Sequence, residues 1–241
     1  MPSAIYVDAA AQSALARRID SIASNVANAA TVGYRADGIK FDSVLSTTGG
    51  SRVSFPVAGR DYISTAGGSL LRTQNPLDCA VRGAGWFSLM SPDGPVYTRD
   101  GRFQLAASGA LQSVNGYEVL DASGAPITLD PSAGEVAIAG DGVIAQQGRR
   151  SGAIGLFTID PDSRLARYDN SSVTSSIPAS PILEFTTNGV AQGYVEQSNV
   201  DPIRELTRLI EIQRAFDNVT STMEIKDAAQ QEAIKTLGSP A

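Results

Sequence analysis

Apolar residues at alternating steps of three and four mark one long helix near the C-terminal end of the chain. The positions are Leu209, Ile212, Phe216, Val219 and Met223. Asp201 suits the N-cap and Pro202 the first helical position, while Gly238 and Pro240 supply a stop. Such a helix is roughly 50 Å long, which exceeds what the core of a small domain needs. The narrow apolar seam therefore predicts a partner helix.

The opposite end of the chain offers that partner. Leu15, Ile19, Ile22 and Val26 repeat the same spacing in an alanine-rich segment that can begin near Ser3. The two terminal segments are thus predicted to pair as helices, although they are far apart in the sequence. Spacing alone favours an ordinary pair of core helices over a coiled coil.

The pattern changes after the first predicted helix. Asn25, Asn28 and Gly33 are residue types that tolerate the conformations of a helix exit. On the other side of the middle region, Ser198, Asn199 and Asp201 precede the second helix. Residues 34–74 contain short apolar pieces among Ser, Thr and Gly, with a break at Gly49-Gly50. We therefore expect an extended connector with weak strands there.

Residues 75–197 are predicted to form an inserted β-rich domain. Short apolar runs alternate with Asp93-Gly94, Asp100-Gly101, Ser108-Gly109, Asn115-Gly116, Ser123-Gly124 and Asp141-Gly142, and such pairs favour tight hairpins. The expected strands are 86–90, 96–99, 102–105, 117–120, 127–129, 135–138 and 154–159. A serine-rich patch at 171–176 is expected to be an exposed loop. The predicted fold is α+β, with discontinuous terminal helices (1–33 and 198–241), the connector 34–74 and a mainly antiparallel β insertion.

Composition narrows the classes of function. The 241 residues are 42% hydrophobic and 18% charged, which is enough to bury a sizeable core. A net charge of -6 argues against nucleic acid as a partner, because binding phosphates requires clustered Lys and Arg. The chain has no histidine and one cysteine, which removes the commonest general base and any cysteine-based metal site. We find no apolar run of transmembrane length and no cleavable secretory signal pattern.

Candidate catalytic groups do not assemble into a site. Cys79 lies in an apolar stretch and has no histidine to activate it, so it is predicted to be a buried structural residue. The carboxylate pairs Asp93 with Asp100 and Asp160 with Asp162 fit turns better than acid and base roles. Gly83-Ala-Gly-Trp-Phe lacks the glycine pattern of a phosphate loop. We therefore predict no enzyme, no cofactor, no metal and no small-molecule substrate.

Three ordered blocks of residues resemble the flagellar rod and hook protein family over nearly the whole chain. The terminal blocks are Ala4-Ile-Tyr6 with Ser24-Asn-Val-Ala-Asn-Ala-Ala-Thr-Val-Gly-Tyr-Arg35, and Gln192-Gly-Tyr-Val-Glu-Gln-Ser-Asn-Val-Asp201 with Leu209-Ile-Glu-Ile-Gln-Arg-Ala-Phe216. The middle block is Asn75-Pro-Leu-Asp-Cys-Ala-Val-Arg-Gly-Ala-Gly-Trp-Phe87, Tyr97-Thr-Arg-Asp-Gly-Arg-Phe103 and Gly116-Tyr-Glu-Val-Leu120. The short length, the Ala-Ile-Tyr start and Trp86 are more similar to the proximal-rod branch than to the distal-rod branch.

The resemblance implies a structural component of the basal-body rod that transmits torque and is exported through the flagellar type III apparatus without cleavage. It implies assembly in the periplasm with other copies and neighbouring rod proteins, through a coiled-coil-like axial domain. Under this hypothesis Leu15, Ile19, Ile22, Val26, Leu209, Ile212, Phe216, Val219 and Met223 form the assembly interface, called the seam below. The junction residues that shape the passage between helices and β domain are Asn25, Asn28, Gly33, Ser198, Asn199 and Asp201.

Two other classes remain open at this point. A distal-rod or hook-type axial protein of the same family would share these motifs. A soluble binding module would use a pocket or an edge strand of the β domain, and its helices would merely close the structure.

Overall fold

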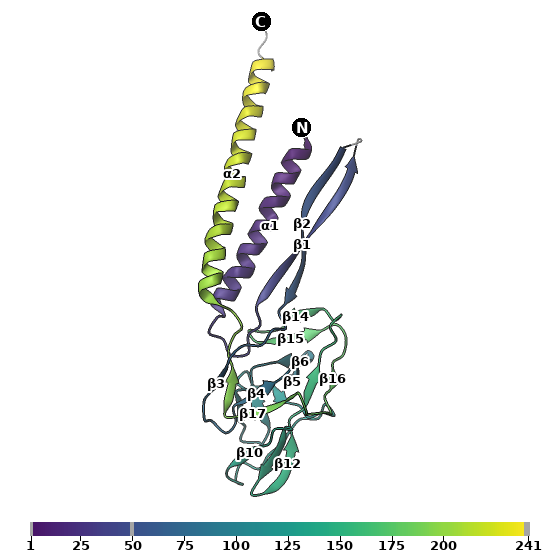
Figure 1. Ribbon diagram of the computed structural model, residues 1–241, viewed down its shortest axis with the longest axis vertical. Coiled ribbons are helices and arrows are strands. Elements are labelled where there is room, and N and C mark those ends of the chain that lie inside the picture. The colour runs from purple at the N-terminus through teal and green to yellow at the C-terminus, as the bar shows by residue number, and fades with distance from the viewer. Residues whose placement is uncertain (1, 49–50, 239–241) are drawn as a thin grey trace. The chain divides into compact units, whose positions relative to one another are not determined.

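The computed structural model describes residues 2–48 and 51–238 (Figure 1). Contacts divide the chain into two compact units. Unit 1 holds the described residues within 1–27, 37–62 and 201–241, and unit 2 holds 28–36 and 63–200. The chain therefore passes between the units at four points. The predicted 34–74 connector is shared, because its central part belongs to unit 1 and its ends belong to unit 2.

Unit 1 contains the two helices expected from the apolar spacing. Helix α1 is Pro2–Ala27 and helix α2 is Pro202–Gly238. The Asp201 carboxylate accepts hydrogen bonds from the backbone N–H groups of Ile203 (3.1 Å) and Arg204 (3.2 Å), which confirms the predicted N-cap. Pro240, the predicted second stop signal, lies outside the described residues.

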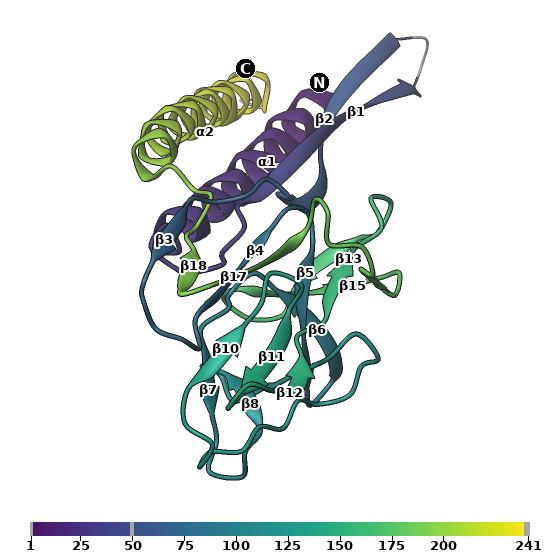
Figure 2. The ribbon, with the colours of Figure 1, turned by 60° about the horizontal axis from the view of Figure 1, so that its bottom comes forward.

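The helices lie side by side and antiparallel (Figures 1 and 2). Polar contacts fix this direction: Lys226 pairs with Asp8, Gln12 Nε2 donates to Thr220 Oγ1 (3.2 Å), and Asn25 Nδ2 lies 3.5 Å from Glu205 Oε2. The two terminal segments therefore meet as predicted. The α+β class and the mainly antiparallel β domain are confirmed, whereas coiled-coil packing of the helices stays a prediction.

A long hairpin replaces the weak strands expected before residue 71. Strand β1 (Asp37–Thr48) pairs with β2 (Ser51–Ile63), and β1 packs beside α1. An isolated two-stranded hairpin is marginal in water and gains stability from packing on a helix. Arg17 of α1 also pairs with Asp61 of β2 at 2.9 Å. The predicted break at Gly49-Gly50 lies outside the described residues.

Unit 2 is built from short strands in several antiparallel sheets. One sheet has the order β14-β15-β6-β5-β9-β8-β7, and β13 joins it by pairing with β5 and with β16. A second sheet has the order β10-β11-β12, and two ribbons pair β17 with β4 and β18 with β3. The bounds are β3 Leu70–Arg72, β4 Cys79–Arg82, β5 Trp86–Ser91, β6 Gly94–Thr98, β7 Phe103–Leu105, β8 Leu111–Ser113, β9 Glu118–Val119, β10 Val136–Ile138, β11 Val143–Gln146, β12 Arg149–Ala153, β13 Leu156–Thr158, β14 Leu165–Arg167, β15 Ser172–Ser175, β16 Ser180–Pro181, β17 Gly189–Gln192 and β18 Tyr194–Glu196.

Three details of unit 2 correct the sequence analysis. The serine-rich patch forms β15, between β14 and β6, where Ser172 and Val173 are buried. The Asp169 carboxylate accepts a hydrogen bond from the backbone N–H of Ser172 at 2.6 Å. The strand consists mainly of small polar side chains, so the sequence has no apolar run that would have predicted it. Residues 127–129 form an isolated bridge at Thr128 instead of a strand. Asp100-Gly101 is not a hairpin turn, because β6 before it pairs with β5 and β15, whereas β7 after it pairs with β8. Gly101 instead packs directly on the Cys79 carbonyl, where a Cβ atom would lie 1.7 Å from the oxygen.

The core of unit 2 encloses Cys79, which is fully buried among apolar side chains as predicted. Burial raises the pKa of this thiol from about 9 to about 12, and Asp78 adds to the shift. The unfolded thiol ionises near pH 9 and the folded one does not. Cys79 therefore stabilises the fold fully below pH 9, and this contribution is lost as the pH rises toward 12.

We expect urea unfolding of the wild type to show a stability loss that steepens above pH 9, by up to about 1.4 kcal/mol per pH unit from this thiol. Cys79→Ala removes the thiol, so its stability, lower at pH 7 because of the missing atom, should fall less between pH 9 and pH 11. Parallel curves for the two proteins over that range would contradict the assignment.

A membrane-spanning helix is not found in the described part of the chain, since neither α1 nor α2 is sufficiently apolar over the required length.

Candidate functional site: the seam and the junction residues

The seam residues of α2 face α1 in unit 1. Described side chains of α2 are buried or half-buried at steps of four and three, at Glu205, Leu209, Ile212, Phe216, Val219, Met223 and Lys226. Ile212 is 6% exposed and is the most buried apolar member. The predicted spacing thus coincides with the face that α2 turns toward its partner. Contact of the seam with neighbouring molecules stays a prediction.

On α1 the predicted positions pack less evenly. Ile22 is buried at 5% exposure, whereas Leu15, Ile19 and Val26 are half-buried. Ala14, one of the alanines of the N-terminal segment, is buried as deeply as Ile22. A small residue lets two helices approach closely, so the alanine-rich composition of α1 contributes to the contact as well as to helix propensity.

Asn25 holds the start of β1 against the end of α1. Its Oδ1 accepts a hydrogen bond from the Asp37 N–H at 2.8 Å, and its Nδ2 donates to the Asp37 carbonyl at 2.9 Å. The side chain is 3% exposed and approaches Glu205 of α2. A buried amide in an apolar seam satisfies backbone groups only in one alignment, so Asn25 specifies the register between α1, β1 and α2.

We expect Asn25→Asp to destabilise the protein by about 2–4 kcal/mol, because the Asp37 carbonyl loses the Asn25 amide donor while Ser21 Oγ still donates to it at 3.2 Å, and because a second carboxylate is placed beside Glu205. Urea unfolding followed by far-UV circular dichroism measures the change. Asn218→Asp is the matched control, since it makes the same chemical change at an exposed position of α2 in the same unit; its effect should stay within about 1 kcal/mol. Equal effects of the two substitutions would remove Asn25 from this role.

The junction residues Gly33, Ser198 and Asn199 belong to unit 2 and fix the backbone of segments within that unit. Gly33 has φ +71°, and a Cβ atom there would lie 2.2 Å from the Asp100 nitrogen, so both conformation and space require glycine. Asn199 Oδ1 accepts from the Ala36 N–H (2.8 Å), and its Nδ2 donates to the Ala66 carbonyl (2.8 Å). Ser198 Oγ accepts from the Val200 N–H at 3.2 Å. Asn199 thereby fastens three segments of unit 2 at one place.

A buried ionic group beside these residues was not foreseen. Glu196 of β18 pairs with Arg35 at 2.7 Å and with Arg99 at 3.1 Å, and both guanidinium groups lie over the Trp86 ring at 5.6 and 5.3 Å. We call Arg35, Trp86, Arg99 and Glu196 the arginine cluster. Each of these four residues is at most 3% exposed. Two cations thus share one carboxylate in the interior of unit 2.

The arginine cluster fastens the segment that follows α1. Arg35 donates to the Ala66 carbonyl, Arg99 donates to the Gly83 carbonyl at 2.9 Å, and Glu196 accepts from the Gly68 N–H at 2.8 Å. Burial lowers the pKa of Arg35 to about 10 against the opposing attraction of Glu196, and it lowers the pKa of Arg99 in the same way. The stability of the arginine cluster therefore depends on the Glu196 carboxylate, which compensates the two buried cations.

No local pattern in the sequence pairs these residues. Arg35, Arg99 and Glu196 each stand inside a block that resembles the rod and hook family, but more than 60 positions separate one from the next. The available signal was the presence of arginine beside aromatic residues, at Tyr34-Arg35 and at Tyr97-Thr-Arg99. Such a pattern indicates a cation stacked on an aromatic ring, but it does not indicate which carboxylate pairs with the arginine.

Comparison with known proteins places three family models on the chain. The model described as "Flagella basal body rod protein" matches residues 5–35, "Flagellar hook protein FlgE/F/G D1 domain" matches 80–146, and "Flagellar basal body rod FlgEFG protein C-terminal" matches 191–236. These ranges include α1 with Arg35, the strands from β4 to β11, and α2 with Glu196.

Similar proteins match from end to end. The chain is 48% identical to the flagellar basal-body rod protein FlgF of Mesorhizobium japonicum and 44% identical to that of Rhizobium meliloti, with 99% of both chains covered in each case. It is 29% identical to the flagellar basal-body rod protein FlgG of Bacillus subtilis, over 90% of this chain and 92% of that one.

Proposed function

Because the chain belongs to the flagellar basal-body rod protein family, we propose that this structural rod component forms part of the proximal rod and assembles through its paired terminal helices. The higher identity to FlgF proteins than to FlgG proteins supports the proximal assignment over the distal one. The observation that carries the assembly proposal is a second apolar stripe on α2, which α1 leaves uncovered.

That stripe begins in the first turn of α2. Ile203, Leu206 and Ile210 follow each other at steps of three and four and are 77%, 47% and 51% exposed. Side chains at this spacing form one continuous face of a helix. Exposed apolar residues that are aligned in this way are typical of a protein interface. The stripe supports packing of α2 against helices of neighbouring subunits.

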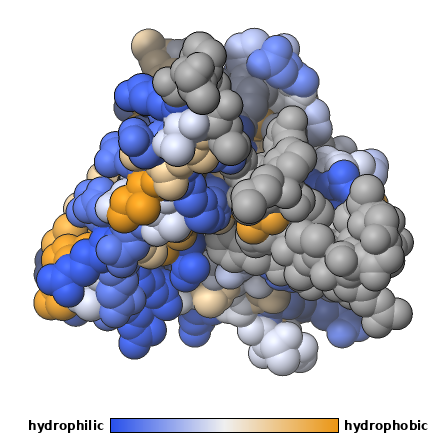
Figure 3. Space-filling view, turned by 90° about the horizontal axis from the view of Figure 1, so that it is seen from above, coloured by the Kyte–Doolittle hydropathy of each residue, from blue (hydrophilic) through white to orange (hydrophobic). Residues whose placement is uncertain are grey.

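The far end of α2 adds to the same argument. Every described side chain from 227 to 236 is exposed, including Ile234 at 70%. Viewed from above, orange hydrophobic side chains stand among blue hydrophilic ones on the molecular surface (Figure 3). A helix that extends this far without cover gains stability when neighbours pack on it, as repeated head-to-tail contacts in a rod would allow.

A rod transmits torque, and we propose that the paired helices carry it along the axis. The arginine cluster and Asn199 hold together the segments of unit 2 that connect to the helices, which supports a role in keeping those connections rigid. The proposed partners are other copies of this chain, neighbouring rod proteins and the flagellar export apparatus. The proposed place is the periplasmic rod, reached by export without a cleaved signal.

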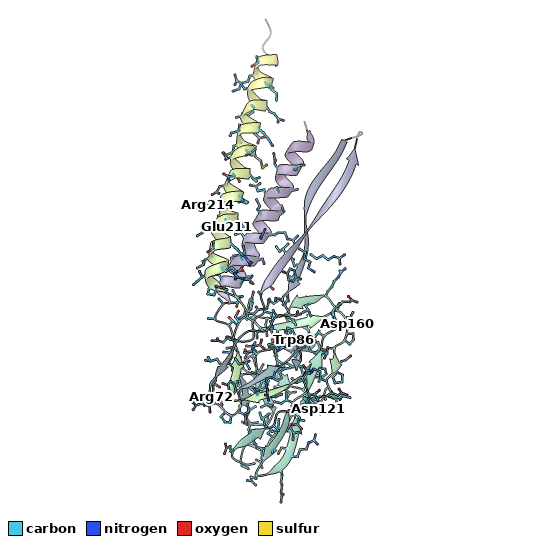
Figure 4. The ribbon with its side chains drawn as sticks, in the orientation of Figure 1. Arg72, Trp86, Asp121, Asp160, Glu211 and Arg214 are labelled. Atoms are coloured by element: carbon cyan, nitrogen blue, oxygen red, sulfur yellow. The ribbon has the colours of Figure 1, made fainter. Side chains whose placement is uncertain are left out.

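Complementation of a gene deletion tests this function. The deletion strain receives the full-length chain, a chain lacking residues 198–241, or a chain with Ile203, Leu206 and Ile210 all changed to Ser. We expect only the full-length chain to restore motility and purified basal bodies with a complete rod. The control carries Glu211→Ala and Arg214→Ala, which change exposed charges of α2 (Figure 4), and it should complement. Basal bodies that assemble and rotate without the protein would overturn the rod assignment.

A further inference from the structure

Strand β3 is an exposed strip on one side of unit 2. Leu70 and Leu71 are 43% and 49% exposed, and Arg72 is exposed beside them. Successive side chains of a strand point to opposite faces, so Leu70 and Arg72 share one face of β3, where an exposed apolar group lies beside a cation, and Leu71 lies on the other face. None of the described residues forms an ion pair with Arg72.

Backbone hydrogen bonds to β18 hold β3 in an extended conformation within the single chain. Gln197 N–H donates to the Ser69 carbonyl at 2.9 Å, and Thr73 N–H donates to the Gly193 carbonyl at 2.8 Å. In an antiparallel pair these bonds recur at alternate residues, so the backbone groups of Leu70 and Arg72 point away from β18 to the open edge. Among the described strands, β18 is the one that pairs with β3. Binding by a preformed strand costs little ordering entropy.

A groove beside β16 of unit 2 offers an apolar residue and a carboxylate, which complement the leucine and the arginine of β3. It has a volume of about 370 Å³, and its lining includes Ile182, Leu183 and Glu184 together with Thr158, Thr186 and Thr187. Leu183 is 78% exposed. Glu184 has no ion-pair partner among the described residues, and Asp160 follows Thr158 by two positions. The groove thus combines an apolar platform, hydroxyl groups and carboxylates.

The two surfaces lie at opposite edges of unit 2. Figure 1 shows β3 on the left of the unit and β16 on the right, and Figure 4 shows Arg72 on the left with Asp160 on the right. A copy therefore cannot place its own β3 in its own groove. Two different surfaces on opposite edges produce a head-to-tail contact, which repeats from copy to copy into a ring or a helix.

We infer that β3 of one copy docks in the β16 groove of the next copy, an inference that rests on the proposed assembly into a rod. Leu70 packs on Leu183, and Arg72, which lies on the same face of β3 as Leu70, pairs with Glu184. The threonine hydroxyls supply hydrogen-bond partners for the open backbone edge of β3. Direct strand addition to β16 is disfavoured, because Pro181 has no backbone N–H to offer, so the contact is made by side chains in the groove.

Cysteine cross-linking in assembled basal bodies tests the inference. The full chain carries Leu70→Cys and Leu183→Cys in a Cys79→Ala background and complements the deletion strain. Mild oxidation should produce a ladder of cross-linked multimers on a non-reducing gel. Neither single-cysteine variant should produce it, and neither should the control pair Leu70→Cys with Val114→Cys, since Val114 is 48% exposed but outside the groove.

Charge reversal provides an independent readout. Arg72→Glu or Glu184→Arg alone should lower the amount of protein in purified basal bodies by about tenfold, and the double variant should recover most of it. If the protein is present in basal bodies but the ladder is missing, the docking inference is wrong and the rod assignment stands. If dimers form from Leu70→Cys alone, β3 pairs with itself and the groove is not its site. If the wild-type protein is absent from basal bodies, the proposed function itself fails.

Discussion

Replacing Glu196 with Gln is expected to lower the free energy of unfolding by about 3–5 kcal/mol, because removing one partner from a buried ionic group leaves the remaining charges uncompensated. Arg35 and Arg99 are 1% and 3% exposed, and Glu196 is the carboxylate that both of them contact. Glutamine keeps the size and one acceptor oxygen, so the loss reports the missing charge and not a cavity.

Trp86 provides the measurement. It is the one tryptophan in the sequence, and both guanidinium groups lie over its ring, at 5.6 and 5.3 Å from the centroid. Urea unfolding at pH 7 followed by its fluorescence therefore reports directly on the arginine cluster. Glu184→Gln is the matched control in the same unit: it makes the same chemical change at an exposed carboxylate and should shift stability by less than about 0.5 kcal/mol. A Glu196→Gln variant as stable as this control would show that the cluster does not hold unit 2 together.

Ile212→Asp is the second substitution with a large expected effect. Ile212 is 6% exposed at the centre of the seam, so aspartate there buries an unpaired carboxylate between α1 and α2. We expect unit 1 to lose more than about 3 kcal/mol, with loss of ellipticity at 222 nm and of amide protection in α1. The Trp86 fluorescence of unit 2 should remain native, and motility should be lost.

Ile210→Asp is the control for this experiment. Ile210 lies two residues away and is 51% exposed on the outer stripe, so the same change leaves the contact between α1 and α2 intact. Its purified monomer should keep wild-type ellipticity and α1 protection. Equal loss of α1 protection in both variants, or in neither, would mean that burial of Ile212 does not stabilise the packing of α1 against α2.

The elements that could be predicted from sequence are those whose signal is local. Asp201 and Pro202 marked the start of α2, since a cap and a fixed φ act within one turn. Asn115-Gly116 and Asp141-Gly142 marked turns, and both glycines have positive φ. The steps of three and four from Leu209 to Met223 marked the face of α2 that packs on α1, because helical periodicity is a property of neighbouring residues.

The errors occurred where no local signal exists. Ser172–Ser175 has the composition of a loop and still forms a strand, because β14 and β6 supply hydrogen bonds on both sides. The β1–β2 hairpin is longer than the weak strands expected, and its packing beside α1 gives it a support that its own composition does not reveal.

The sequence by itself determined the two terminal helices, the seam between them, the antiparallel β insertion and the resemblance to rod proteins. Tertiary structure alone decided the arginine cluster, the register set by Asn25, and the placement of β3 and the β16 groove on opposite edges of unit 2. The physical reason is distance along the chain. Capping, turn conformation and helical periodicity act over a few residues, whereas a buried ion pair or an exposed edge depends on which remote segments the fold brings together or leaves apart.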